Sequence, residues 1–594
     1  MIRQIPIGFD DFRVLREKNF EYVDKTHFIT EFIDRESIKV ILVPRPRRFG
    51  KSLNLSMLKW FFEKRDENVW HLFEGLHVAR AGEKYREHFQ KYPVIHISFK
   101  ETKATTFEEF LARAKDNIQA MYRAHEQVLA GKLGALEAKK YQAVLEGTAD
   151  NVGYMLSLKH LTEWLHQIHG VRPIVLIDEY DAGIHAAYIH QFYDKAIEFC
   201  ASFFLAGLKD NLHLERAVMT GILRVSRESI FSDLNNIGVF SLLRGEFKTC
   251  FGFTEQEVFD LLQRVEATDM MEPIRSYYNG YEFGGVGIYN PWSILSFLAN
   301  VNKDLIPYWV GTSSNRLIKE MLQHHAFTVQ EEIETLLEGG YIEKELDENV
   351  VFPDLKKDPR SLWNLLVFSG YLKAAKPPGP YDKTEAPPPY RLSIPNREVA
   401  KVYRNSFDTW MNEALVGQGG TLRAFLDALL KGDVSEFEYQ LQKFAASLPS
   451  YHDVRGTNPE TFYHGMMIGL LASLEPEYEV RSNRESGDGR PDVLIKPRHT
   501  GKPGVVLELK SARKGQTTIE KAMADGLKQF DENDYAAELR AAGVEKIQQM
   551  VVAFNGKRVM VLPKGAKPPK KKSSAKKNTK DKVDKKKKST KKKP

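Results

Sequence analysis

The stretch KVILVPRPRRFGKS at 39–52 decides the fold. Its first part, KVILVP at 39–44, is apolar and rich in β-branched residues, which predicts a buried strand. After it, SLNLSMLKWFFEK places Leu53, Met57 and Trp60 at the spacing of one helix face. The sequence therefore predicts a strand, a tight loop and a helix in immediate succession.

The loop ends in Gly50, Lys51 and Ser52, the end of the pattern G-x-x-x-x-G-K-[ST], but Arg45 holds the place of its first glycine. In such loops backbone N–H groups and a helix N-terminus face phosphates. The lysine reaches the β- and γ-phosphates, and the Ser hydroxyl binds Mg²⁺. The match leaves three interpretations open: a chance turn, a broken site, or a variant loop that binds ATP.

Three further runs predict buried strands: VIHISF at 94–99, PIVLIDEYD at 173–181 and RAVMTGI at 216–222. Short apolar strands separated by helices predict an α/β fold, a parallel sheet with helices on both faces. Asp178 ends the third strand as a metal-binding acid would, and Glu179 follows it, placed to orient or deprotonate a water. The acids alone also fit a solvated strand end, but together with the loop they favour a nucleotide site.

Composition is that of an ordinary multidomain globular protein. The chain has 594 residues, 42% of them hydrophobic and 28% charged, and two cysteines, which cannot build a disulfide framework. No secretory signal and no membrane-length apolar run are found. We therefore expect a soluble intracellular protein, cytoplasmic or, in a eukaryotic source, nuclear.

The positive net charge of +7 arises from the C-terminal tail alone. Residues 564–594 hold sixteen lysines and two aspartates, a charge of +14, which leaves −7 for everything before them. This tail has almost no apolar residues and is expected to be disordered. It would bind nucleic-acid phosphates without sequence choice, act as a nuclear-localisation-like cluster, or serve only as a solubilising extension.

The pattern along the chain predicts four parts. They are a P-loop domain at 1–300, a mostly helical middle region at 301–440, an α/β domain at 441–563 and the Lys-rich tail at 564–594.

A second group of polar residues lies in GDGRPDVLIKPRHTGKPGVVLELKSA, where Asp492 opens one predicted strand and Glu508 and Lys510 lie on the next. Side chains alternate along a strand, so Glu508 and Lys510 share a face and Leu509 points to the core. Two carboxylates on adjacent strands can hold Mg²⁺, and a nearby lysine can position or activate a water. That is the chemistry of phosphodiester hydrolysis, although E-x-K also occurs on ordinary surface strands.

Many motifs in order give the first 320 residues a resemblance to the predicted AAA-ATPase-like family of P-loop proteins. They are Gly8-Phe9 with Phe12, YVDKT at 22–26, RPRRFGKS at 45–52, LIDEYD at 176–181, TGI at 220–222, SDLNN at 232–236, YYNGYEF at 277–283 and YNPWS at 289–293. The resemblance implies ATP and Mg²⁺ binding, with Asp178 and Glu179 as the acidic pair. It assigns Lys51 and Ser52 to the nucleotide, and we expect the loop residues Arg45, Arg48, Phe49 and Gly50 to contribute to binding.

Two further residues are candidates for sensing the γ-phosphate. Thr220 ends its strand where a sensor would lie, and Arg224 follows four residues later. Either residue also fits an ordinary turn or helix face. The role of the arginines at 45, 47 and 48 stays open in the same way. They form a solvated basic loop, or they add positive charge around the triphosphate or a partner.

Residues 440–562 resemble the PD-(D/E)XK nuclease superfamily through PD-x(n)-E-x-K and the preceding helix TFYHGMMIGLLASL at 461–474. The resemblance implies that Asp492, Glu508 and Lys510 are catalytic, with Glu460 and Gln529 as supporting residues. His452 and His464 fit loop or helix-face positions better than metal ligands.

These features predict an ATP-binding protein, expected to hydrolyse ATP, with a metal-dependent nuclease-like domain acting on DNA or RNA. Two alternatives stay open: an ATP-switched regulatory scaffold that binds nucleic acid or protein without cutting, and an ATPase with a relic nuclease fold and a protein partner. A homo-oligomer is also open.

Overall fold

The computed structural model divides the chain into two compact units, residues 1–407 and 408–594. It describes residues 3–224, 236–309, 316–325, 329–337, 339–348, 352–377, 388–403, 422–447, 463–464, 467–468, 470–474, 477–482, 491–512, 517–556 and 558–567. Glu460, His452 and the tail from 568 onward lie outside these residues. None of the helices in the described ranges has the length and apolar character needed to cross a membrane.

Unit 1 is built on a parallel sheet of five strands in the order β2-β3-β4-β1-β5. The strands are β1 (Val40–Pro44), β2 (Val94–Ser98), β3 (Ile174–Asp178), β4 (Arg216–Gly221) and β5 (Ile237–Val239). Every residue of β1, β3 and β4 is buried, as expected for strands covered on both faces. The predicted α/β fold with an N-terminal parallel sheet is confirmed.

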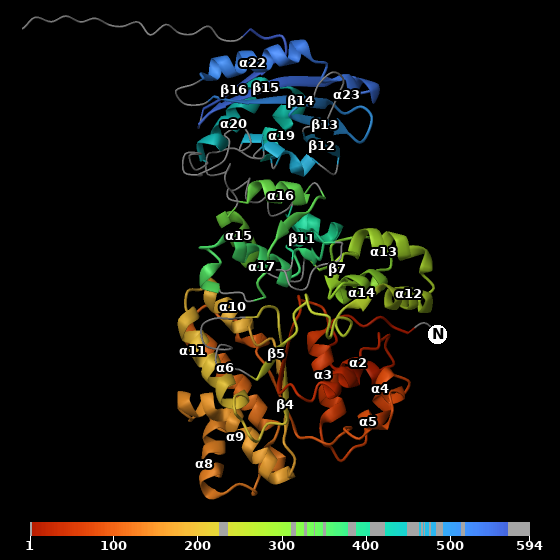
Figure 1. The fold of residues 1–594 in the computed structure, drawn as a ribbon, viewed down its shortest axis with the longest axis vertical. Coiled ribbons are helices and arrows are strands. Elements are labelled where there is room, and N and C mark those ends of the chain that lie inside the picture. Colours follow the sequence, from red (N-terminus) through yellow and green to blue (C-terminus); the bar gives the residue numbers. More distant parts are fainter. Residues whose placement is uncertain are drawn as a thin grey trace, which may run out of the picture. The chain divides into compact units, whose positions relative to one another are not determined.

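Helices cover both faces of this sheet. Figure 1 shows α2–α5 on one side of β4 and β5, and α6, α9 and α11 on the other. The helices are α1 (Phe12–Glu17), α2 (His27–Asp34), α3 (Lys51–Phe62), α4 (His77–Arg80), α5 (Glu83–Arg86), α6 (Phe107–Arg123), α7 (Glu126–Leu129), α8 (Ala135–Leu145), α9 (Asn151–His169), α10 (Ala182–Ile189) and α11 (Tyr193–Leu208).

The register brings three polar strand ends to one edge. Val43 pairs with Thr220, and Ile177 with Met219, so Asp178, the last residue of β3, lies beside Thr220 on β4. The loop after β1 leaves the sheet at the same edge, because the carboxyl ends of parallel strands coincide. The predicted acid and the predicted loop therefore meet, with β4 between their strands.

Part of unit 1 packs around a separate apolar cluster beside a second small sheet. Helices α12 (Glu255–Arg264), α13 (Met271–Tyr278) and α14 (Pro291–Ala299) bury one cluster beside the antiparallel strands β6 (Phe253–Thr254), β7 (Tyr281–Phe283) and β8 (Val286–Tyr289). Beyond them lie α15 (Arg316–His325), α16 (Gln330–Leu337) and α17 (Pro359–Phe368), which add to the main core instead.

The middle region is mostly helical, as predicted, and it has two further features. It contains an antiparallel sheet of β9 (Ile342–Lys344), β10 (Lys373–Ala375) and β11 (Tyr390–Ser393), whose three- and four-residue strands are too short to show an alternating pattern. It is also not one body: its described residues up to 403 belong to unit 1, whereas α19 (Leu422–Lys431) belongs to unit 2.

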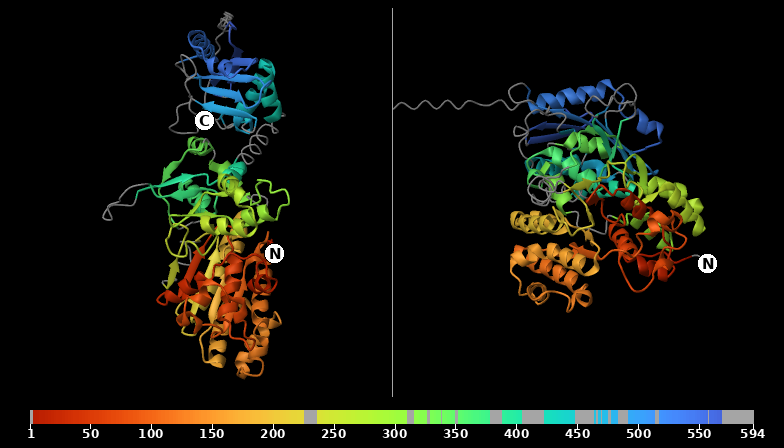
Figure 2. Two further views of the ribbon diagram at one scale, coloured as in Figure 1. Left: turned by 90° about the vertical axis from the view of Figure 1, so that its right-hand side faces the viewer. Right: turned by 60° about the horizontal axis from the view of Figure 1, so that its bottom comes forward.

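Unit 2 is a five-stranded mixed sheet in the order β12-β13-β14-β15-β16. Its strands are β12 (Tyr478–Ser482), β13 (Val493–Pro497), β14 (Gly504–Ser511), β15 (Ile547–Asn555) and β16 (Arg558–Pro563). Helix α22 (Ile519–Glu532) covers one face, and α19 and α20 (Val434–Ser447) cover the other; α23 (Ala537–Ala541) follows α22 (Figures 1 and 2). The predicted C-terminal α/β domain is confirmed.

A buried carboxyl group connects the late part of unit 1 to the loop. Glu398, fully buried, accepts hydrogen bonds from Ser293 Oγ (2.7 Å) and from the Trp309 backbone N–H (2.6 Å). The Trp309 indole in turn donates to the carbonyl of Arg47 at 3.2 Å. Burial raises the pKa of Glu398 to about 7, and the two hydrogen bonds only partly oppose that rise.

We predict that Glu398→Gln is more stable than the wild type at pH 8 by about 1–3 kcal/mol and equally stable near pH 5. The raised pKa means that the folded state binds the proton more tightly, so the contribution of Glu398 to stability falls as pH rises through about 7. An amide removes the charge: its oxygen still accepts from the Trp309 N–H, and its NH2 group can donate to Ser293 Oγ in place of the bond that Ser293 now donates. Urea unfolding at both pH values measures the difference, and a difference that does not change with pH contradicts the assignment.

Candidate functional site

The carboxylate of Asp178 ties together the three elements at the sheet edge. Ser52 Oγ, in the first turn of α3, donates to Asp178 Oδ2 at 2.5 Å. Thr220 Oγ1 on β4 and the Glu179 N–H donate to Asp178 Oδ1 at 2.6 and 3.0 Å. Asp178 is only 3% exposed, so these donors replace the water that a buried carboxylate loses.

The loop before α3 holds Lys51 over this edge. Gly50, at φ 84°, adopts the left-handed conformation that favours glycine, and α3 begins at the next residue. The Lys51 ammonium donates to the carbonyls of Arg45 (3.0 Å) and Pro46 (2.9 Å) inside the loop. Burial lowers the pKa of Lys51, while Glu179 and Asp178 act in the opposite direction.

Two non-glycine residues at this edge also have left-handed backbones: Arg48 (φ 68°) and Glu179 (φ 47°). Such conformations cost roughly 1–2 kcal/mol each for residues with a Cβ. Strain of this kind concentrates at functional sites, where the surrounding structure enforces it. Here it turns the side chains of both residues toward one cavity.

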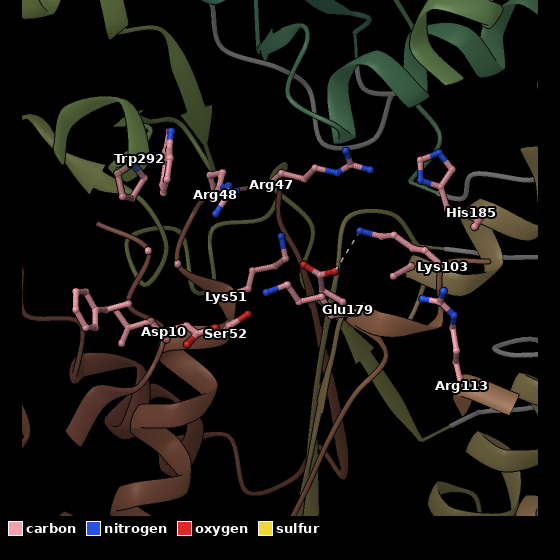
Figure 3. A pocket seen from close by; sticks show the side chains of 18 of the residues that line it. Asp10, Arg47, Arg48, Lys51, Ser52, Lys103, Arg113, Glu179, His185 and Trp292 are labelled. Carbon is pink, nitrogen blue, oxygen red and sulfur yellow. Dashed lines mark ion pairs between the residues drawn. The ribbon is translucent and has the colours of Figure 1, made fainter. Parts of the chain in front are cut away.

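This cavity has a volume of about 840 Å³, and Lys51, Ser52 and Glu179 lie on its wall (Figure 3). The basic side chains around it outnumber the acidic ones: they are Arg47, Arg48, Lys51, Lys100, Lys103 and Arg113, against Asp10, Glu109 and Glu179. Lys103 Nζ lies 3.9 Å from a Glu179 carboxylate oxygen. The cavity is therefore suited to a polyanion in the volume range of small-molecule sites.

Apolar side chains line another part of the wall. Phe9, a large apolar residue with 41% exposure, is joined there by Leu53, Trp292 and Leu295. The Arg48 guanidinium lies 4.3 Å from the centre of a Trp292 ring. A ligand with both a flat apolar group and several negative charges matches the two parts of this wall.

Arg45 and Phe49 do not lie where the sequence predicts. Arg45 is fully buried, donates to the carbonyls of Pro44, Phe240 and Phe247, and contacts two phenylalanine rings. Phe49 packs against two aromatic rings in the same core. Neither side chain lines the cavity, so Arg45 is neither a solvated residue nor a charge on the phosphate side. A buried guanidinium needs hydrogen-bond acceptors. The bonds that Arg45 donates to backbone carbonyls hold the loop backbone in place from the core side.

The two expected sensors lie in different environments. Thr220 is fully buried and contacts Asp178, not the cavity wall. Arg224 does not line the cavity either, and it is the last described residue before the gap at 225–235.

Several residues at the edge were not predicted from the sequence. Asp181 is buried and accepts from the N–H groups of Ile222 and Leu223, which locks the end of β3 to the end of β4. Lys103 and His185 join the cavity wall from elements distant from the loop. Burial lowers the pKa of His185 to about 3, so its imidazole is neutral near pH 7.

Unit 2 brings the second predicted group together. Val493 pairs with Leu507, so Asp492 lies beside Glu508 at the start of β13. Asp492 Oδ2 accepts from the Leu509 N–H at 2.7 Å, and Lys510 Nζ donates to Glu508 Oε1 at 2.7 Å. Glu508 is 2% exposed. Two carboxylates and an ammonium thus share one small region of the sheet.

Helix α22 passes over this group. A Cβ on Gly526 would lie 3.3 Å from Lys510 Cγ, and Gln529 follows one turn later with a buried Oε1 that accepts no hydrogen bond from a described residue. Tyr535 was missed from the sequence: burial raises the pKa of its phenol to about 12, and the charges of Glu508 and Asp492 add to the rise. His464 Nε2 lies 3.0 Å from the Asp492 carbonyl.

Comparison with known proteins finds a family match for one segment in each unit. Residues 6–231 match the family model described as Predicted AAA-ATPase, and residues 458–563 match the PD-(D/E)XK nuclease superfamily. The chain therefore joins a segment of the predicted AAA-ATPase family to a segment of the PD-(D/E)XK nuclease superfamily, the fusion that its motifs resemble.

A relative shares most of this length. Over 504 residues the chain is 28% identical to a protein of Azotobacter chroococcum mcd 1 described as "Uncharacterized protein in vnfD 5'region". The alignment covers 83% of this chain and 87% of that protein.

The different positions of Arg45 and Arg47 give a matched pair of variants. We predict that Arg45→Ala lowers the free energy of unfolding by about 3 kcal/mol, because it leaves buried carbonyls without their donor. Arg47→Ala should change stability by less than about 0.5 kcal/mol and weaken binding of a fluorescent ATP analogue, since Arg47 lies on the cavity wall. Equal stability loss in both variants would contradict the placement of Arg45.

Proposed function

We propose that unit 1 binds and hydrolyses ATP in the cavity beside α3. The observation that carries this proposal is the Asp178 carboxylate, which joins Ser52 on α3 to Thr220 on β4, next to the buried Lys51 that precedes Ser52. Lys51, Arg47 and Arg48 supply positive charge for the triphosphate, together with the N–H groups at the start of α3. Phe9 and Trp292 offer apolar surface to the base.

The donor set also fits Mg²⁺. Ser52 lies on the cavity wall, and its Oγ is 2.5 Å from Asp178 Oδ2; hard oxygen ligands of this kind are those Mg²⁺ prefers. When bound, the ion would neutralise charge on the phosphates. Glu179 would act on the attacking water, as its carboxylate lies on the wall between Lys51 and Lys103 (Figure 3).

Two variants separate binding from hydrolysis. We expect Lys51→Ala to abolish ATP binding, and Glu179→Gln to keep binding while lowering turnover by at least about 100-fold, the usual range for loss of a general base. Phosphate release and equilibrium binding of an ATP analogue measure the two effects. Glu108→Gln, an exposed acid of α6 outside the cavity, is the matched control and should retain turnover. Wild-type turnover by Glu179→Gln would remove Glu179 from the mechanism.

We further propose that unit 2 hydrolyses phosphodiester bonds of DNA or RNA. Asp492 and Glu508, side by side on β13 and β14, offer the oxygen atoms that a divalent ion needs. Such an ion would stabilise negative charge on the scissile phosphate. Lys510, which is hydrogen-bonded to Glu508, would position or activate the water.

Cleavage assays test this second proposal. We expect Asp492→Asn and Lys510→Met to lose at least about 100-fold of the Mg²⁺- or Mn²⁺-dependent cleavage of plasmid and single-stranded nucleic acid by the full chain. Asp525→Asn, an exposed acid on α22, is the control and should cut as the wild type does. Identical products from the wild type and Asp492→Asn would rule out cleavage by this site and favour an ATP-switched scaffold that does not cut.

A further inference from the structure

A cluster of three side chains outside both proposed sites joins helix α2 to the segment at 247–252. His27 and Glu31 lie one turn apart on α2 and so share a face. Cys250 approaches this face, with its Sγ 3.4 Å from Glu31 Oε1. One ligand atom from each residue lies within 4.8 Å of the other two.

We propose that His27, Glu31 and Cys250 bind a divalent transition-metal ion of the Zn²⁺ type. An imidazole nitrogen, a thiolate and a carboxylate oxygen are the ligands that zinc takes in proteins. In a tetrahedral site the ligand atoms lie about 3.3–3.8 Å apart, as follows from bonds of about 2.0–2.3 Å. Cys250 Sγ and Glu31 Oε1 already have this spacing at 3.4 Å, and the His27 ligand nitrogen lies within 4.8 Å of both. Water would complete the fourth position.

The charges around the cluster are compatible with a bound cation. On binding, the Cys250 thiol releases its proton to solvent, so one thiolate and one carboxylate balance a charge of +2. Glu31 Oε2 is held by the Phe247 N–H and by Arg35, each at 3.1 Å, which orients Oε1 toward Cys250. Of the nearby cations, Lys25 is paired with Glu257, and Arg45 is bonded to backbone carbonyls.

The site would clamp α2 to the segment that supports the phosphate loop. The Cys250 carbonyl accepts from Asn54 Nδ2 of α3 at 2.7 Å. The Phe247 carbonyl accepts from Arg45 at 3.1 Å, and the Gly252 N–H donates to the Phe49 carbonyl at 3.3 Å. A metal at Cys250 therefore acts as a structural clip beneath the loop and stabilises unit 1 whether or not ATP is hydrolysed.

Cobalt titration of the chelator-treated full chain tests the site. We expect one equivalent of Co²⁺ to give a thiolate-to-cobalt absorption band in the near ultraviolet, which added Zn²⁺ removes. Cys250→Ser and His27→Gln should lose this band, whereas Cys200→Ser should keep it. Cys200 is the matched control because it is buried in α11 and belongs to no metal-ligand cluster among the described residues. The carboxylates of unit 2 cannot produce a thiolate band.

Thermal unfolding gives a second readout. Zn²⁺ should raise the melting temperature of the wild type and of Cys200→Ser, and should leave that of His27→Gln unchanged. His27 is only partly buried, so this variant tests the site even if Cys250→Ser fails to fold. Absence of the band in the wild type, or its persistence in both ligand variants, would overturn the proposal.

Discussion

The nucleotide site depends on one buried carboxylate. The Asp178 carboxylate accepts three hydrogen bonds. They come from the Ser52 hydroxyl on α3, from the Thr220 hydroxyl on β4 and from the backbone N–H of the next residue, Glu179. A carboxylate removed from water needs such donors, and only the meeting of parallel strand ends supplies them at one point. The hydrogen bond from Ser52 to Asp178 therefore fixes the distance between α3 and Glu179, the acid that follows β3.

The sequence predicts this arrangement well because its signals are local. KVILVP is an apolar run that leads into the loop before Lys51, and PIVLID is one that ends in Asp178; parallel pairing of both strands with β4 brings these ends to one edge. The burial of Arg45 could not be predicted from such local signals. Its charge predicts exposure, and only the tertiary structure shows three carbonyls and two rings around it. Lys103 and His185 carry no local signal, since topology alone brings them to the cavity.

The site in unit 2 is predicted from a different regularity, the alternation of side chains along a strand. Alternation along β14 puts Glu508 and Lys510 on one face, and the antiparallel register adds Asp492 from the neighbouring strand. Tyr535, in the chain after α22, lies near enough for the charges of Glu508 and Asp492 to raise its pKa, and no periodic pattern marks it. Each unit thus assembles its acidic residues internally, at strand ends or along one strand face, and the proposed activities rest on separate sets of side chains.

The most direct measurement is a crystal structure of the full chain with Mg²⁺ and a non-hydrolysable ATP analogue. The account predicts the analogue in the cavity beside α3, with Lys51 Nζ moved from the carbonyls of Arg45 and Pro46 to the phosphates. Ser52 Oγ and Asp178 should lie on the metal side of the triphosphate, and Arg45 should stay buried. An analogue bound elsewhere, or Lys51 still bonded to both carbonyls beside a bound triphosphate, would contradict it.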